Sequence, residues 1–180
     1  MQLQIIQGDI TKIQAEAIVN AAHPTLLGGS GVDGAVHRAA GKELLKECMK
    51  IRAEQYKEGL PVGEAVVTKA YGLEKDGVKL IIHTTGPRYF RGNPEKLRNC
   101  YINSLKLAEE HNCKSIVFPA ISTGAFGMPM EYSIKVVKEV MDNYEFNEIE
   151  RVILCFRAEE DKVIAEKAFG KGACQNENKK

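Results

Sequence analysis

The sequence has few cysteines, and their spacing matches neither a metal site nor a disulfide framework. The 180 residues include five cysteines that are widely separated and form no CxxC pair. An odd number of thiols cannot all pair within one chain. We therefore expect buried, reduced thiols, no bound metal and no cofactor. The five are Cys48, Cys100, Cys113, Cys155 and Cys174.

An excess of charge of either sign is also absent. Lysine and arginine number 25 against 24 for aspartate and glutamate, which gives a formal net charge of +1. A nearly neutral chain has no broad electrostatic field for holding a polyanion such as DNA. We expect a small or local anion as the partner, and no nucleic acid polymer.

Long apolar runs are missing as well. The N-terminal residues MQLQIIQGDI contain neither the basic segment nor the apolar segment of a secretory signal. No uninterrupted apolar run approaches the roughly 18 residues of a membrane-spanning helix. These absences predict a cytoplasmic protein without a membrane partner.

The patterns that are present predict one α/β domain. Helical spacing of apolar residues at 97–108 and 134–141 alternates with short apolar runs that are typical of strands. With 44% hydrophobic residues, the chain can bury one substantial core. We expect a layered domain at residues 1–170, with helices on both faces of the sheet, and a polar tail at residues 171–180. The predicted strands are residues 3–6, 17–19, 65–68, 80–83, 115–118 and 152–156.

A glycine-rich segment follows the second predicted strand. Gly29, Gly31 and Gly34 formally match the GxGxxG pattern, but residues 20–28 separate them from the strand, which disfavours an ordinary Rossmann turn. Glycines still permit positive φ, and N–H groups near the helix expected to start at Gly34 can hold a diphosphate. The alternative is a tight turn that serves packing alone.

A second loop with the same properties follows the most clearly apolar strand. Residues 118–129 read FPAISTGAFGMP, where Ser122, Thr123 and Gly124 offer hydroxyls and uncovered main chain and Phe126 offers an apolar wall. Two such loops at strand ends fit one ligand that carries two phosphates.

Two further residues at strand ends could recognise a base. Asp9 can accept a hydrogen bond from an exocyclic amine, and the Phe156 ring can stack on a base. The alternatives are that Asp9 only caps a turn or helix and that Phe156 belongs to the core.

In combination these segments resemble the macro-domain family, in particular its hydrolase branch of O-acetyl-ADP-ribose deacetylases and mono-ADP-ribosyl hydrolases. The resemblance covers nearly the whole chain and implies a three-layer α/β fold with a mixed central sheet. It implies ADP-ribose, or a derivative such as a mono-ADP-ribosylated protein, as the partner. The matching segments are GDIT at 8–11, IVNAA at 18–22, residues 28–41, IHTTGP at 82–87 and residues 118–127.

The resemblance also implies roles for individual residues. Asp9 would contact the adenine amine, Phe156 would stack near adenine, and Phe126 would face the distal ribose. Asp33 would position or activate the attacking water, as a carboxylate beside a phosphate loop can, unless it only caps the following helix. The full predicted ligand-binding set is Asp9, Ile10, Asn20, Gly28, Gly29, Gly31, Val32, Ser122, Thr123, Gly124, Ala125, Phe126 and Phe156.

Two residues depart from the family pattern, and both lie in the first loop. His23 replaces the second asparagine of the motif Asn-Ala-Ala-Asn, and Ser30 interrupts the glycine run. Both substitutions could be drift. Alternatively, Ser30 as nucleophile and His23 as base form a serine esterase, natural or engineered. The sequence shows no evident third member to orient the imidazole, for which Asn20 and Asp33 are the nearest candidates.

Three hypotheses therefore remain. The first is a hydrolase of ester-linked ADP-ribose derivatives that uses Asp33, and the second is an ADP-ribose reader without turnover. The third is a serine esterase, which requires the pair of Ser30 and His23, whereas the other two do not.

Overall fold

Six strands form one mixed sheet in the computed structural model, which describes residues 1–170. The strand order is β1-β6-β5-β2-β4-β3, and all neighbours are parallel except β3, which runs antiparallel to β4. All six predicted apolar runs lie within strands. The strands are β1 (Gln2–Gln7), β2 (Ala17–Ala21), β3 (Ala65–Lys69), β4 (Leu80–Thr84), β5 (Ser115–Phe118) and β6 (Arg151–Phe156).

Burial explains why these segments are recognisable in the sequence. All residues of β4 and β5 are buried, because parallel strands in the middle of a sheet are covered on both faces. The edge strand β3 instead alternates between buried and partly exposed positions, as an antiparallel edge with one solvated face does.

Within residues 1–170, four α-helices and two short 3-10 helices connect the strands, and a fifth α-helix follows β6. The predicted helical segments 97–108 and 134–141 lie inside α3 and α4. The first helix begins at Gly31 and not at Gly34, because the Ser30 carbonyl already accepts the Gly34 N–H at 3.3 Å and closes the first turn. The helices are α1 (Gly31–Ala40), α2 (Lys42–Gln55), α3 (Lys96–Glu110), α4 (Met130–Asn143) and α5 (Glu159–Phe169), with 3-10 turns at Ile10–Lys12 and Tyr71–Asp76.

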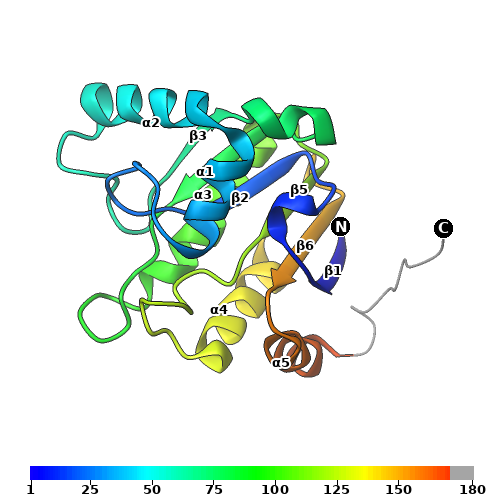
Figure 1. Ribbon diagram of the computed structural model, residues 1–180. Helices are drawn as coiled ribbons and strands as arrows, with labels where there is room; N and C mark the ends of the chain where they lie inside the picture. Colours follow the sequence, from blue (N-terminus) through cyan, green and yellow to red (C-terminus); the bar gives the residue numbers. More distant parts are fainter. Residues whose placement is uncertain (171–180) are drawn as a thin grey trace.

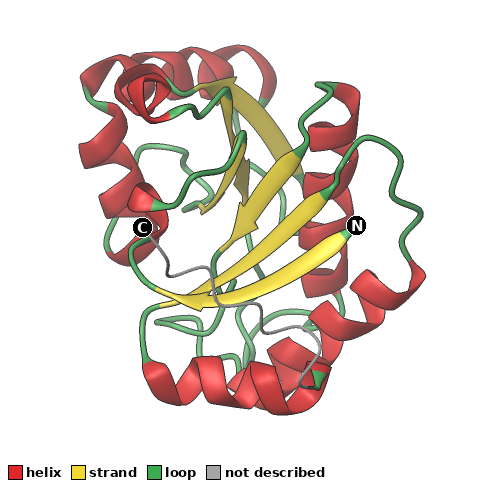
Figure 2. Cartoon of the chain, turned by 90° about the vertical axis from the view of Figure 1, so that its right-hand side faces the viewer, coloured by secondary structure: helices red, strands yellow, loops and turns green. Residues whose placement is uncertain are grey.

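The sheet separates two hydrophobic clusters, as Figure 2 shows with helices on both sides of the strands. One cluster contains Ile18 and Ile81 and packs against α1 and α2. The other contains Val19 and Ile82 and packs against α3, α4 and α5. Successive residues of one strand thus enter opposite clusters, as the period of two requires. The predicted three-layer α/β fold with helices on both faces is confirmed.

Neighbouring strands send the chain to opposite faces of the sheet. β2 leads into α1 on one face, whereas its neighbour β5 leads into α4 on the other (Figure 1). A crevice forms beyond the carboxyl ends of the strands where the chain direction divides in this way. The fold therefore places a binding cleft beside residues 22–33 and 119–129.

The cysteines of the described part match the expectation from their spacing. Cys48, Cys100, Cys113 and Cys155 are buried and free. Cys174 and the polar tail at 171–180 lie outside the described residues, so the domain boundary near residue 170 stays a prediction. Within residues 1–170, no helix is both long and apolar enough to span a bilayer.

Candidate active site

A cleft at the carboxyl edge of the sheet consists of two adjoining pockets. They have volumes of about 220 and 540 Å³ and share Gly31, Val32, Ala120 and Gly124 in their walls. Pockets for small molecules commonly enclose about 300–1,000 Å³. The shared walls make the two pockets one elongated cleft with a separate environment at each end.

Most of the predicted site residues line this cleft. The first pocket contains His23, Gly29, Ser30, Gly31, Val32, Asp33, Ser122, Gly124, Ala125 and Phe126. The second contains Asp9, Ile10, Gly31, Val32, Thr123, Gly124 and Phe156. Asn20 and Gly28 line neither pocket. Sequence reasoning missed Ala21, Ala22, Gly86, Ala120 and Ile121, although three of these belong to the motifs IVNAA and IHTTGP.

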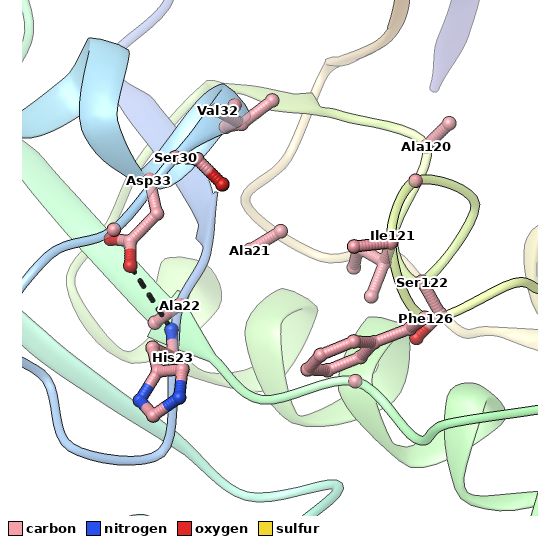
Figure 3. Close-up of a pocket in the computed structure, with 15 residues that line it drawn as sticks. Ala21, Ala22, His23, Ser30, Val32, Asp33, Ala120, Ile121, Ser122 and Phe126 are labelled. Atoms are coloured by element: carbon pink, nitrogen blue, oxygen red, sulfur yellow. Dashed lines mark hydrogen bonds between the residues drawn. The ribbon is translucent and has the colours of Figure 1, made fainter.

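Asp33 is buried in the wall of the first pocket. Its Oδ1 accepts a hydrogen bond from Asn20 Nδ2 at 2.8 Å, and its Oδ2 accepts one from the His23 main-chain N–H at 3.1 Å (Figure 3). Asp33 is the third residue of α1, so the alternative of a helix-capping role is wrong. The carboxylate lies in the first turn, where the helix dipole favours negative charge.

A buried polar chain beneath the cleft holds Asn20 in place. His83 Nδ1 lies 3.1 Å from Asn20 Nδ2, and His83 Nε2 lies 2.9 Å from Thr68 Oγ1. Burial lowers the pKa of His83 to about 3, so the imidazole is neutral at pH 7. Because Asn20 Nδ2 is a donor, His83 Nδ1 accepts and His83 Nε2–H donates to Thr68. Asn20 therefore orients Asp33 from below.

The opposite wall is a strained loop. Ser122 has a positive φ of 67° and a buried Oγ without a hydrogen-bond partner among the described residues. A Cβ placed on Gly86 would clash with this Oγ and lie 2.7 Å from Ile121 Cγ2, so any larger residue there would force the loop to shift. The Phe126 ring projects toward the cleft from this wall (Figure 3). The Arg88 guanidinium stacks over this ring, with its carbon 4.6 Å from the ring centroid.

The second pocket contains a carboxylate with one uncommitted oxygen. Asp9 Oδ1 accepts hydrogen bonds from Thr11 N at 2.9 Å and Thr11 Oγ1 at 2.7 Å. The Thr11 hydroxyl, followed by the Thr11 main-chain N–H, lowers the pKa of Asp9. Oδ2 makes no hydrogen bond with the described residues. Asp9 thus caps the 3-10 turn and still faces the pocket, while the Phe156 ring is 4% exposed and belongs to the core at the pocket wall.

The model of the family described as Macro domain matches residues 19–137. The chain belongs to this family. It is 44% identical over 164 residues to O-acetyl-ADP-ribose deacetylase 1 of Pantoea vagans, with 88% of this chain and 93% of that protein covered.

Two solved macro domains have the same fold. The Oceanobacillus iheyensis macrodomain with ADP superposes with a TM-score of 0.86 at 38% identity, over 92% of this chain and 88% of that one. The Trypanosoma brucei macrodomain in complex with ADP-ribose superposes with a TM-score of 0.79 at 33% identity, over 92% and 68%.

This macro domain does not join Ser30 to His23. Within residues 1–170, the Ser30 hydroxyl makes no hydrogen bond and does not cap α1. His23 Nδ1 instead lies 2.9 Å from Thr25 Oγ1 and accepts the Thr25 N–H at 3.2 Å. Figure 3 shows the Ser30 hydroxyl and the His23 imidazole well separated. A serine nucleophile requires a base within about 2.6–3.2 Å, so this geometry does not favour the esterase.

Three polar residues at or behind the walls of the cleft were not predicted from the sequence, namely Arg157 and Asp161 of the second pocket and His37 of α1. His37 follows Asp33 by one turn of α1, and its Nε2 lies 3.6 Å from Asp33 Oδ1 without a hydrogen bond. A Cβ on Gly28 would lie 3.4 Å from His37 Cγ, so the Gly28 main chain packs against the His37 ring. The four-residue spacing of Asp33 and His37 indicates that the two side chains are neighbours on one face of a helix.

Proposed function

We propose that this macro domain binds ADP-ribose and hydrolyses ester-linked ADP-ribose derivatives such as O-acetyl-ADP-ribose. The observation that carries the proposal is the single cleft that joins the Asp9 carboxylate at one end to the Asp33 carboxylate at the other. The relatives, which include an O-acetyl-ADP-ribose deacetylase and a macrodomain in complex with ADP-ribose, support the same substrate class.

The main chain between the two carboxylates offers donors for a diphosphate. The N–H groups of Gly124, Ala125 and Phe126 make no hydrogen bond with described residues. On the facing wall, the first N–H groups of α1 at Gly31 and Val32 have no partner within the helix. Such groups bind phosphates at helix N-termini and in glycine loops. The diphosphate would therefore lie between the two loops.

Adenine and the distal ribose would then occupy opposite ends of the cleft. Adenine at the second pocket would donate its amine to Asp9 Oδ2 and contact the edge of Phe156. The distal ribose and its ester would lie between Phe126 and Asp33. This placement agrees with the roles that the family resemblance implies.

Asp33 would position the water that attacks the ester. Each Asp33 oxygen accepts one hydrogen bond from the protein and keeps a lone pair for a water molecule. The water oxygen adds to the acyl carbon, the bond from this carbon to the ribose oxygen breaks, and the ribose oxygen takes up a proton. Acetate and ADP-ribose leave, and one proton passes to solvent.

The decisive experiment measures binding and turnover separately. Calorimetry with ADP-ribose tests the cleft, and chromatography of O-acetyl-ADP-ribose tests hydrolysis. We expect Asp33→Ala to lower kcat by about 100-fold or more while ADP-ribose affinity changes little. Binding without turnover in the wild type would instead establish a reader.

Ser30→Ala separates this mechanism from the serine esterase. We expect it to retain hydrolysis, because the Ser30 hydroxyl has no base. Loss of activity in Ser30→Ala, together with a fluorophosphonate adduct on Ser30, would contradict the proposal. Mono-ADP-ribosylated protein as a substrate and the cytoplasmic location remain predictions.

A further inference from the structure

A basic aromatic loop borders the end of the cleft where Phe126 lies. This loop comprises residues 88–91, Arg-Tyr-Phe-Arg, and we call it the RYFR loop. Tyr89 N donates to Phe126 O at 2.9 Å, and the Arg88 guanidinium covers the Phe126 ring. A Cβ on Gly127 would lie 3.6 Å from the Phe90 ring. The RYFR loop is thus fixed to the wall that would face the distal ribose.

The RYFR loop exposes an aromatic ring that the fold does not use. Phe90 is 85% exposed, more than any other large hydrophobic side chain in residues 1–170. Its neighbour Tyr89 is anchored by edge contacts with Phe90 and Tyr132, at centroid distances of 5.0 and 5.9 Å. Aromatic residues and arginine are enriched at protein interfaces relative to the rest of the surface, and the RYFR loop supplies both.

The charges beside Phe90 have no acidic partner. Arg88 and Arg91 are exposed, and neither forms an ion pair within residues 1–170. Other exposed cations nearby are compensated, for example Arg98 by Glu139. Two unpaired guanidinium groups complement carboxylates, which they can bind in a bidentate manner. The net charge of +1 for the whole chain argues against a nucleic acid as the occupant.

We propose that the RYFR loop binds the acidic residues that flank an ADP-ribosylated carboxylate side chain in a protein substrate. The inference rests on the proposed function, which places the ester of the ligand beside Phe126. A protein substrate must leave the cleft from this ester, so its chain passes over the RYFR loop. Phe90 contacts the backbone and apolar atoms of this chain, and Arg91 pairs with its acidic side chains.

The test compares the variant Phe90→Ala/Arg91→Glu with the wild type on two peptides. Both peptides carry ADP-ribose on a glutamate, one between acidic residues and one between lysines. We expect the wild type to favour the acidic peptide by about three- to fivefold in kcat/KM, and high salt to reduce this preference. The variant should lose the preference.

A matched control makes the same changes on α2. Met49 is 53% exposed and Lys50 is also exposed, and neither lines the cleft. Met49→Ala/Lys50→Glu should keep the preference for the acidic peptide. Equal rates for both peptides in the wild type, or a preference that survives Phe90→Ala/Arg91→Glu, would overturn the inference.

Two further measurements separate the docking surface from the chemistry. Free O-acetyl-ADP-ribose should be hydrolysed within about twofold of wild type by the RYFR variant, because neither changed residue lines the cleft. Failure of the wild type on this substrate would count against the proposed function alone.

If the wild type fails to hydrolyse O-acetyl-ADP-ribose, an NMR titration with the unmodified acidic peptide tests docking independently of turnover. Shifts should concentrate at Phe90 and Arg91, and their absence would overturn the inference. An ADP-ribosylated oligonucleotide that is turned over faster than either peptide would overturn it as well.

Discussion

Thr68 lies outside the cleft, yet its hydroxyl is the hydrogen-bond partner of the His83 Nε2–H. The Asn20 amide requires Nδ1 as the acceptor, and Thr68 satisfies the N–H on the other side of the ring. Thr68→Val would leave a buried N–H unpaired at a cost of about 1–3 kcal/mol in unfolding free energy. The proton can then move to Nδ1, where it opposes the Asn20 amide. We expect kcat to fall about tenfold, because Asp33 loses its orienting contact, while ADP-ribose affinity stays within about twofold.

Thr85→Val provides the control for this substitution. The Thr85 hydroxyl is buried but has no hydrogen-bond partner among the described residues, so its removal should not destabilise the protein. Imidazole ¹⁵N shifts give a readout that a general loss of packing would not produce. The prediction fails if Thr68→Val keeps the Nε2–H tautomer of His83 and also keeps normal turnover.

Asp9 offers a second prediction at the scale of one residue. Asp9→Asn keeps an Oδ1 that can accept from Thr11 but places an NH₂ group where Oδ2 faces the second pocket. Two hydrogen-bond donors, this NH₂ group and the adenine amine, would then face each other. ADP-ribose binding should weaken by about 1–3 kcal/mol, while the melting temperature changes little.

The hypoxanthine analogue of ADP-ribose is the control ligand for Asp9→Asn. It carries a carbonyl oxygen in place of the amine, so Asp9→Asn should shift the preference toward it in calorimetry. An unchanged order of affinities would exclude Asp9 as the adenine contact.

Among the structural elements, the loop after β5 is constrained by its contact with Gly86. Gly86→Ala would bring a Cβ against Ser122 Oγ and to 2.7 Å from Ile121 Cγ2. Overpacking of this kind costs about 1–3 kcal/mol. We expect a lower melting temperature and weaker ADP-ribose binding, since the whole loop must shift. Gly124→Ala in the same loop meets no atom within 4 Å and should leave the melting temperature unchanged.

A double-mutant cycle isolates the cause. Ser122→Gly removes the hydroxyl and relieves the positive φ of 67°. Gly86→Ala should therefore destabilise the Ser122→Gly protein less than it destabilises the wild type. Equal destabilisation in both backgrounds would show that Ser122 is not the obstacle.

The elements also show which features the sequence could predict. The strands were predictable because β4 and β5 are buried throughout, which requires unbroken apolar runs. The cleft residues were predictable because glycine loops follow the strands. The link between Asn20 and His83 was not, because it depends on the register that pairs these two residues across β2 and β4. The start of α1 depends on the main chain of Ser30, which no side-chain pattern reveals.

At the scale of the whole molecule, His83 should make stability depend on pH in the acid range. Its folded pKa of about 3 lies below the ordinary value of 6.5, so the unfolded chain binds the extra proton first. The contribution is complete above about pH 6.5 and is lost as pH falls toward 3, by up to about 1.4 kcal/mol per pH unit. Urea unfolding between pH 4 and 7 should show this slope.

His83→Gln removes the titrating group and serves as the reference for that slope. The free energy of unfolding of the wild type relative to that of His83→Gln should fall as pH falls from about 6.5 toward 3, since the acidic groups they share cancel. Proton NMR gives an independent check, because the His83 C2–H shift should stay constant from pH 5 to 8. A midpoint near 6.5 in the folded protein would contradict the buried neutral state.

The two walls of the cleft are anchored in different hydrophobic clusters. Val36 of α1 packs in one, whereas Ile121 and Met128 of the facing loop pack in the other, beyond the sheet. Both departures from the family pattern, His23 and Ser30, lie on the α1 wall. The cleft is therefore modular in an evolutionary sense. One wall can accumulate substitutions that alter chemistry or specificity while the other keeps its shape, so new activities can arise without a new fold.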